Sequence, residues 1–153
     1  MIAQNHVGGI VGLVSGANAE VTTCINHANV QGYYCVGGIA GAVKAGAEVH
    51  LSANYGDVKG NGIIGGVAGR VSTTGMYSNG SAKECAVYDV YNLGQVSGYG
   101  TTAGSEMGGI VGEAGYENWK QEALPPMPVI ERAYSVPISS GVNRNGGIIG
   151  LSL

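Results

Sequence analysis

The feature that most restricts the fold of this chain is a motif that returns five times, Gly-Gly-(Ile/Val)-x-Gly. Its copies are separated by 29, 28, 43 and 38 residues and begin at Gly8, Gly37, Gly65, Gly108 and Gly146. Each complete interval holds a second block that starts with Val or Ile and ends, five residues later, in Asn or Ser. These blocks are Val21–Asn26, Val49–Asn54, Val87–Asn92 and Ile130–Ser135. Repetition of this kind indicates an array of equal structural units.

The basic unit has 28 residues, and the longer intervals become regular once insertions are placed at 72–86, 99–107 and 113–129. Each unit offers three short extended segments separated by Gly or Asn. Strands this short cannot bury an apolar face alone, but copies stacked about 4.8 Å apart can. The sequence therefore predicts an all-β fold, a parallel β-solenoid (β-helix) of about four rungs, 8–36, 37–64, 65–107 and 108–145, plus the start of a fifth.

Equivalent positions in the units form columns with a constant or a variable character. One apolar column is expected to point inward and stack directly, and it contains Ile10, Ile39, Val67, Ile110 and Ile148. Another column varies freely, which predicts that it faces outward: Leu13, Ala42, Arg70 and Glu113. A third contains Asn26, Asn54 and Asn92, whose amides are expected to form a hydrogen-bonded ladder. The corner glycines are expected to supply positive φ angles and close backbone approach.

Composition narrows the class of protein. Of the 153 residues 44% are hydrophobic and only 11% charged, with a net charge of −3, and Lys and Arg form no run. We therefore expect no nucleic-acid binding. No stretch approaches 18 apolar residues, so no membrane insertion is expected in this chain. Cys24, Cys35 and Cys85 have no CxxC spacing; buried free thiols and a disulfide both remain open.

The residues Cys24-Ile-Asn26, Val30, Gly32 and the run Val36–Gly41 resemble the GLUG repeat of bacterial secreted and surface proteins. In that family the repeats occur in adhesin-like proteins and accompany some IgA-cleaving metallopeptidases. The resemblance implies a right-handed β-helical spacer or scaffold and places the chemistry in other domains. It favours a single repeat domain, 1–153, that is a fragment of a longer array. It also implies an extracellular or cell-surface location, although Met1–Asn5 does not resemble a signal peptide.

Chemical motifs of enzymes are missing from the sequence. No HExxH is present, GGxG is not followed by the Asp of calcium-binding repeats, and the acidic residues are scattered. We expect no enzyme activity, no catalytic residues, no cofactor and no metal. The one acidic grouping that the columns predict is Asp89 near Glu131 and Arg132 on an exterior face.

Two insertions carry the candidate binding residues Tyr77, Tyr116 and Trp119. These rings either pack each loop over the flank of the solenoid or bind a host protein or glycan, since binding residues concentrate on loops held by rigid scaffolds.

Three functions follow from this sequence. The first is a structural or adhesive module, a stalk or scaffold in a surface protein. The second is a ligand- or glycan-binding module that uses the paired insertions 72–86 and 113–129. The third is a fibre subunit that associates head to tail, because Val7–Gly12 and Gly146–Gly150 are apolar, lack Pro and share one phase of the repeat.

Overall fold

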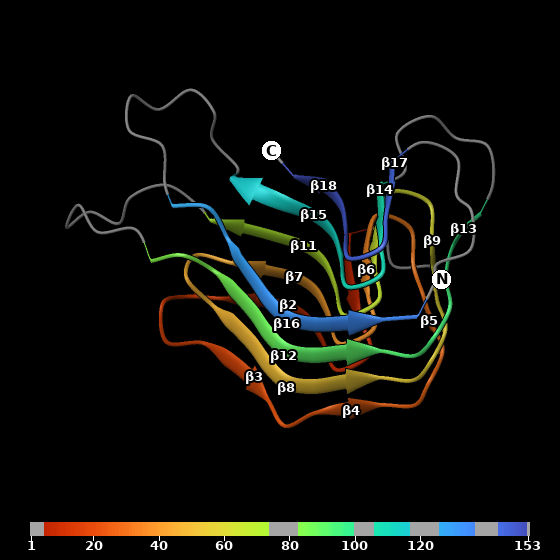
Figure 1. Cartoon of the computed structure of the whole chain (residues 1–153), viewed down its shortest axis with the longest axis horizontal. Coiled ribbons are helices and arrows are strands. Elements are labelled where there is room, and N and C mark those ends of the chain that lie inside the picture. The colour runs from red at the N-terminus through yellow and green to blue at the C-terminus, as the bar shows by residue number, and fades with distance from the viewer. Residues whose placement is uncertain (1–4, 74–82, 100–105, 117–125, 137–143, 153) are drawn as a thin grey trace.

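A computed structural model describes residues 5–73, 83–99, 106–116, 126–136 and 144–152 of the chain. The regular secondary structure of these residues consists of β-strands. The strands pair in parallel to form four sheets, which we name A to D (Figure 1). The chain passes through the four sheets in the order A, B, C, D and then begins again. The fold is therefore all-β with parallel sheets.

Each sheet is built from strands one repeat apart. Sheet A contains, in spatial order, β1 (His6–Gly8), β6 (Cys35–Gly37), β10 (Ile63–Gly65), β14 (Glu106–Gly108) and β17 (Arg144–Gly146). Sheet B contains β2 (Val11–Ser15), β7 (Ala40–Lys44), β11 (Ala68–Thr73), β15 (Val111–Tyr116) and β18 (Ile149–Ser152). Sheet C contains β3 (Glu20–Thr22) with β4 (Ile25–Asn26), then β8 (Glu48–Asn54), β12 (Ala86–Asn92) and β16 (Val129–Ser135). Sheet D contains β5 (Val30–Gln31), β9 (Val58–Gly60) and β13 (Val96–Gly98).

The register of the sheets confirms the predicted alignment of the repeats. The first glycines of the five motifs pair in sequence through sheet A, and the Asn column pairs through sheet C and continues into Ser135. Pairing survives the unequal spacings because the insertions leave the strands at corners.

The prediction of three extended segments per unit is wrong, since the described residues of the second and third units form four strands each. The Gly-Gly-Ile motif is the bend between a strand of sheet A and a strand of sheet B. A Cβ on Gly37 would lie 2.0 Å from the carbonyl oxygen of Ala40, so a side chain does not fit inside this bend. The motif glycines thus serve close approach. Among the described residues, the glycines with positive φ are Gly16 and Gly46, at the corner between sheets B and C.

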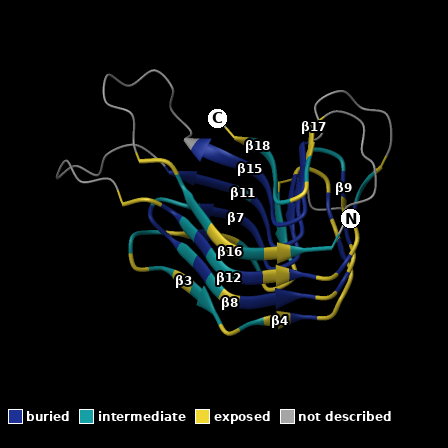
Figure 2. Ribbon diagram, in the orientation of Figure 1, coloured by how far each residue is buried: buried dark blue, intermediate teal, exposed yellow. Residues whose placement is uncertain are grey.

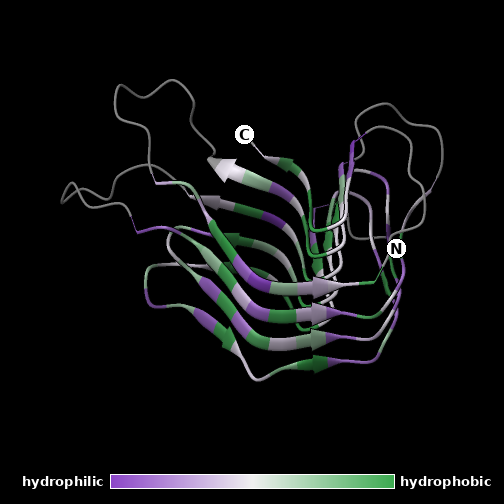
Figure 3. Ribbon diagram, viewed as in Figure 1, coloured by the Kyte–Doolittle hydropathy of each residue, from purple (hydrophilic) through white to green (hydrophobic). Residues whose placement is uncertain are grey.

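Two hydrophobic cores lie between the sheets. The larger core is between sheets B and C and includes Val43, Val49, Val71 and Val87, all fully buried. The smaller core is between sheets A and D and contains Val30, Val36, Val58, Ile64, Val96 and Met107. Figures 2 and 3 show the buried and apolar positions repeating from layer to layer, with exposure rising at the outermost strands.

The predicted inward column is confirmed in the interior layers, where Ile39, Val67 and Ile110 are fully buried. The prediction that Ile10 points inward is wrong, because 46% of its surface is exposed. The reason is its position in the outermost layer, where described residues cover it from one side only. Ile148 is partly buried against the larger core.

The column predicted to face outward is mostly covered. Leu13 is exposed, but Ala42 is fully buried and the Glu113 side chain is only 12% exposed. Arg70 and Glu113 face residues next to or in sheet A: the Arg70 guanidinium lies 5.9 Å from the centre of the Tyr34 ring, just before β6, and Glu113 lies near Glu106 of β14. Within this covered layer Arg70 and Glu113 form an ion pair with Nε–Oε1 at 2.8 Å.

Candidate functional site

The two large insertions leave and re-enter the sheets at adjacent positions. Both leave sheet B, where Thr73 at the end of β11 pairs with Tyr116 at the end of β15. Both return to sheet C, where Ala86 at the start of β12 pairs with Val129 at the start of β16. The bases of the insertions are therefore adjacent at their exits and at their returns, as predicted from the column alignment.

The predicted aromatic residues lie at or beyond the limits of the described segments. Tyr77 and Trp119 lie outside the described residues, and Tyr116 is placed only as the last residue of β15. Their proposed role in binding stays a prediction.

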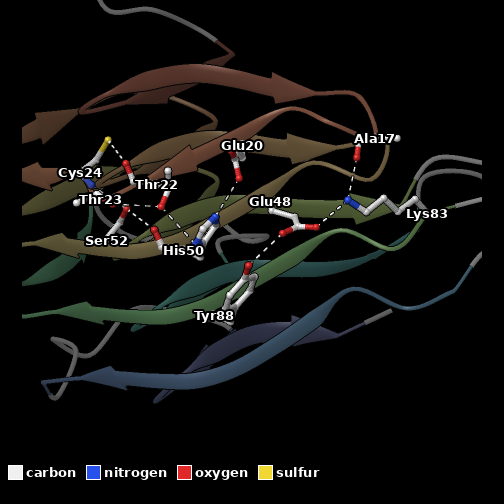
Figure 4. A network of polar contacts seen from close by, with 10 residues as sticks. All are labelled: Ala17, Glu20, Thr22, Thr23, Cys24, Glu48, His50, Ser52, Lys83 and Tyr88. Carbon is white, nitrogen blue, oxygen red and sulfur yellow. Dashed lines mark hydrogen bonds and ion pairs between the residues drawn. The ribbon is translucent and has the colours of Figure 1, made fainter.

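Lys83 fixes the returning end of the first insertion to two lower layers of the molecule. Its ammonium donates a 2.8 Å hydrogen bond to the carbonyl oxygen of Ala17 and a 2.7 Å bond to Glu48 Oε1 (Figure 4). The second carboxylate oxygen of Glu48 accepts a 3.2 Å bond from the Tyr88 hydroxyl. A single lysine thus connects the insertion with the corner after β2 and with β8.

These contacts change the acidity of the groups involved. The hydrogen bond from Lys83 holds the pKa of Glu48 below its ordinary value, although burial opposes this. The same bond raises the pKa of Lys83. Partial burial, together with the bond to Glu48, raises the pKa of Tyr88. Glu48 is therefore held ionised at neutral pH, whereas a catalytic general acid needs a raised carboxyl pKa.

Two hollows flank the Glu48–Lys83 pair on the outer surface of sheet C. One has a volume of about 320 Å³ and is lined by Glu48, Lys83, Glu84, Ala86, Tyr88, Val129 and Glu131. The other has a volume of about 230 Å³ and is lined by Ala17, Asn18, Ala19, Glu20, Glu48 and Lys83. The larger of these two hollows lies where both insertions re-enter sheet C, and its lining includes carboxylates, one ammonium group and a phenol.

The predicted Asn ladder is confirmed and buried. The Asn26 amide nitrogen donates to Asn54 Oδ1 at 2.8 Å, and Asn54 donates to Asn92 Oδ1 at 2.8 Å. Asn92 continues the column toward the Ser135 hydroxyl at 3.4 Å. Each Asn nitrogen also donates to the carbonyl oxygen two residues ahead, at Ala28, Gly56 or Gly94. The ladder therefore connects the layers and also closes the corner between sheets C and D.

The second glycines of the first three motifs pack directly against this ladder. A Cβ on Gly38 would lie 2.2 Å from Asn54 Cγ, and one on Gly66 would lie 2.3 Å from Asn92 Nδ2. The motif and the Asn block, which are separate in the sequence, are thus one structural unit. The shared 28-residue spacing in the sequence shows that the motif and the Asn block both recur, but it does not show that they are in contact.

The outer face of sheet C carries side chains that interact from layer to layer. Arg132 Nη2 contacts Asp89 Oδ2 at 3.0 Å and Arg132 also pairs with Glu131, which confirms the predicted grouping. The bond to Arg132 holds the pKa of Asp89 below its ordinary value.

Sequence reasoning missed the ring contacts on this face. His50 stacks on Tyr88 at 4.8 Å between ring centroids, and His27 stacks on Tyr55 at 4.8 Å. The Tyr55 hydroxyl also hydrogen-bonds that of Tyr91 at 2.8 Å. These rings occupy equivalent or neighbouring columns, which is the signal that could have found them. Stacked rings cover each other's faces, so these contacts stabilise neighbouring layers against each other.

Within the described residues no cluster of three or more His, Cys, Asp or Glu side chains has the arrangement needed to hold a metal ion. All three cysteines are free, with Cys35 and Cys85 buried. The described segments also include no helix with the length and apolarity needed to cross a bilayer. Comparison of the chain with protein-family models, with curated proteins and with solved structures finds no match.

Proposed function

We propose that this chain is a right-handed parallel β-solenoid that acts as a structural and adhesive repeat module, a stalk or scaffold, in a bacterial cell-surface or secreted protein. The GLUG repeat that its sequence resembles supports the handedness, the location and the role. The observation that carries the proposal is the unbroken register of equivalent residues through four parallel sheets, which includes the buried Asn column.

The physical argument starts from the backbone. Each interior strand hydrogen-bonds to a layer on either side, so the layers cannot slide without breaking a row of bonds. The Asn column adds side-chain bonds between layers in a place that water does not reach, since Asn54 and Asn92 are fully buried. A stack held in this way is suited to keeping a fixed length and direction, which is what a stalk requires.

Hydrogen exchange with small-angle scattering tests the structural part of the proposal. We expect amides of β7, β8, β11 and β12 to exchange far more slowly than those of the outermost strands, and the scattering curve to fit the stacked layers. Uniformly fast exchange, or the scattering of an expanded chain, would contradict it.

A second function, ligand binding through the paired insertions, is favoured by one observation. The hollow of about 320 Å³ lies where both insertions return to sheet C and is lined by polar and aromatic groups. We propose a glycan or a host surface protein as the ligand class.

Glycan and host-protein arrays separate the two functions. A binding module predicts a signal that falls at least tenfold in a Tyr77→Ala, Trp119→Ala double variant. The signal is retained in a control variant, Tyr33→Ala, because Tyr33 lies between β5 and β6, at a different corner from the paired insertions 72–86 and 113–129. A stalk predicts that neither the chain nor its variants bind.

A further inference from the structure

Two tyrosines from adjacent layers of sheet C meet on its outer face. Tyr55 directly follows β8, and Tyr91 lies in β12. The register of the two strands pairs Ala53 with Tyr91, so the two tyrosines are diagonal neighbours across adjacent strands. Their hydroxyl oxygens lie 2.8 Å apart, and their ring centroids lie 5.8 Å apart with the ring planes at 89°. Among the described residues, this is the one hydrogen bond that joins two tyrosine hydroxyls.

The backbone and its neighbours fix the two rings relative to each other. Asn54, next to Tyr55, donates a 2.8 Å hydrogen bond to the Oδ1 atom of Asn92, next to Tyr91. Both asparagines are fully buried, so the two strands cannot shift without breaking the Asn ladder. On its other side the Tyr55 ring stacks on His27, with the ring planes 15° apart. The contact between the phenols is therefore built on a fixed register and is not a chance meeting of two free surface side chains.

Both phenols can be reached from solvent and both can be oxidised. Tyr55 is 39% exposed and Tyr91 is 36% exposed. The hydrogen bond with Tyr55 raises the pKa of Tyr91, so Tyr91 keeps its proton at neutral pH. Removal of one electron and one proton from a phenol leaves a radical that is shared between the oxygen and the two ortho carbons. Because these carbons flank the carbon that carries the oxygen, hydroxyls in contact bring ortho carbons of the two rings close together.

We propose that Tyr55 and Tyr91 are a site of oxidative cross-linking, at which a one-electron oxidant, such as the oxidised haem of a peroxidase, joins the two rings as dityrosine. Each phenol loses one electron and one proton, and the two radicals form a carbon–carbon bond between their ortho carbons. The two ortho hydrogens then move to the oxygens, which restores both hydroxyls. Hydrogen peroxide accepts the two electrons and two protons and becomes two molecules of water.

The cross-link joins two layers of the stack covalently, which goes beyond the stalk role proposed above. All three cysteines are free, so no disulfide makes such a connection. Tyr55 and Tyr91 are 36 positions apart, and the segment between them includes the insertion 72–86. Closing a loop of this length restricts the unfolded chain as a disulfide does. We therefore expect the cross-linked protein to have a Tm about 5–10 °C above that of the unmodified protein.

Proximity, and not exposure, selects this pair. Tyr134 is 62% exposed and is the register partner of Tyr91, and Tyr33 is 51% exposed. Within the described residues, however, ring contact between two tyrosines occurs at Tyr55 and Tyr91 alone. Two groups held in contact have an effective concentration far above that of a second protein molecule in dilute solution. At low protein concentration we therefore expect the 55–91 link inside one chain in preference to links between chains.

Oxidation of the full chain by a haem peroxidase with hydrogen peroxide, at low protein concentration, tests the site. We expect dityrosine fluorescence and a monomer whose mass has fallen by that of two hydrogen atoms. Tryptic peptide 45–59 contains Tyr55 as its one tyrosine, and peptide 84–120 contains Tyr91. Fragmentation of the joined peptides in mass spectrometry then identifies the two linked residues.

Tyr55→Phe and Tyr91→Phe keep the rings but remove the hydroxyls, and each variant is expected to lose the intramolecular link and the rise in Tm. The matched control Tyr134→Phe is expected to keep both, because Tyr134 lies beside Tyr91 without taking part in the pair. Circular dichroism before oxidation verifies that all three variants are folded. The proposal is overturned by a retained intramolecular link in either of the first two variants. It is also overturned if the wild type gives only links between molecules, or no 55–91 link where free tyrosine is coupled.

Discussion

The buried Asn ladder allows a stability prediction worked from named bonds. Replacing Asn54 with Leu keeps the side-chain volume nearly constant but removes three hydrogen bonds: from Asn26, to Asn92 Oδ1 and to the Gly56 carbonyl oxygen. A typical intramolecular hydrogen bond contributes about 1 kcal/mol net, and buried groups left without a partner add to the loss. We therefore expect Asn54→Leu to lower the free energy of unfolding by about 3 kcal/mol.

For a domain of this size the loss corresponds to a fall in Tm of about 6–12 °C. Thermal and denaturant unfolding followed by circular dichroism measures it. Asn29→Leu is the matched control, because Asn29 is exposed and its described side-chain contact is one bond, accepted from the Asp57 amide. The control is expected to cost less than about 1 kcal/mol. A melting curve of Asn54→Leu within 2 °C of the wild type, by the same scale of about 2–4 °C per kcal/mol, would refute the ladder as a source of stability.

Three further predictions concern backbone and charge. Gly38→Ala is expected to lower Tm strongly, since its Cβ would lie 2.2 Å from Asn54 Cγ, whereas Gly147→Ala, with nothing within 4 Å, should leave the Tm unchanged. Leu51, exposed at φ 49°, should tolerate Asn but lose about 1–2 kcal/mol in denaturant unfolding as the β-branched Val, although Val favours strands. Burial, with Glu113 nearby, raises the pKa of Glu106, so the stability that this group contributes is complete below its unfolded pKa and falls as pH rises through its folded pKa. Melting curves from pH 4 to 8 should show that fall in the wild type but not in Glu106→Gln, and parallel curves would contradict it.

Much of the strand pairing could be predicted because the chain repeats. In a stack of equal units, residues one period apart become neighbours, so a column in the alignment is also a column in space. The glycines from Gly8 to Gly146 pair as aligned, and Asn26, Asn54 and Asn92 bond as aligned. The unequal intervals did not disturb this result, because the additional residues lie at corners and leave the strand register unchanged.

Contacts across a layer could not be predicted in this way. The spacing shows that Gly38 and Asn54 both recur, but only the bend between sheets A and B brings them together. The same bend divides each motif between two strands, so the unit has four strands where three were expected. A periodic sequence specifies which residues repeat along the stack and says little about which ones meet inside each layer.

The sequence by itself determined the all-β parallel stacking, the register and the Asn column, because these depend on neighbours one period away. Only the tertiary structure decided that the variable column is mostly covered: Arg70 and Glu113 vary as surface residues do, yet their side chains are only 21% and 12% exposed. Only it decided that Thr23, Leu51, Asp89 and Arg132, at equivalent positions in the four layers of sheet C, share a positive φ. Such features depend on how a layer folds back on itself, and a chain of small apolar residues and glycines carries no local pattern for that.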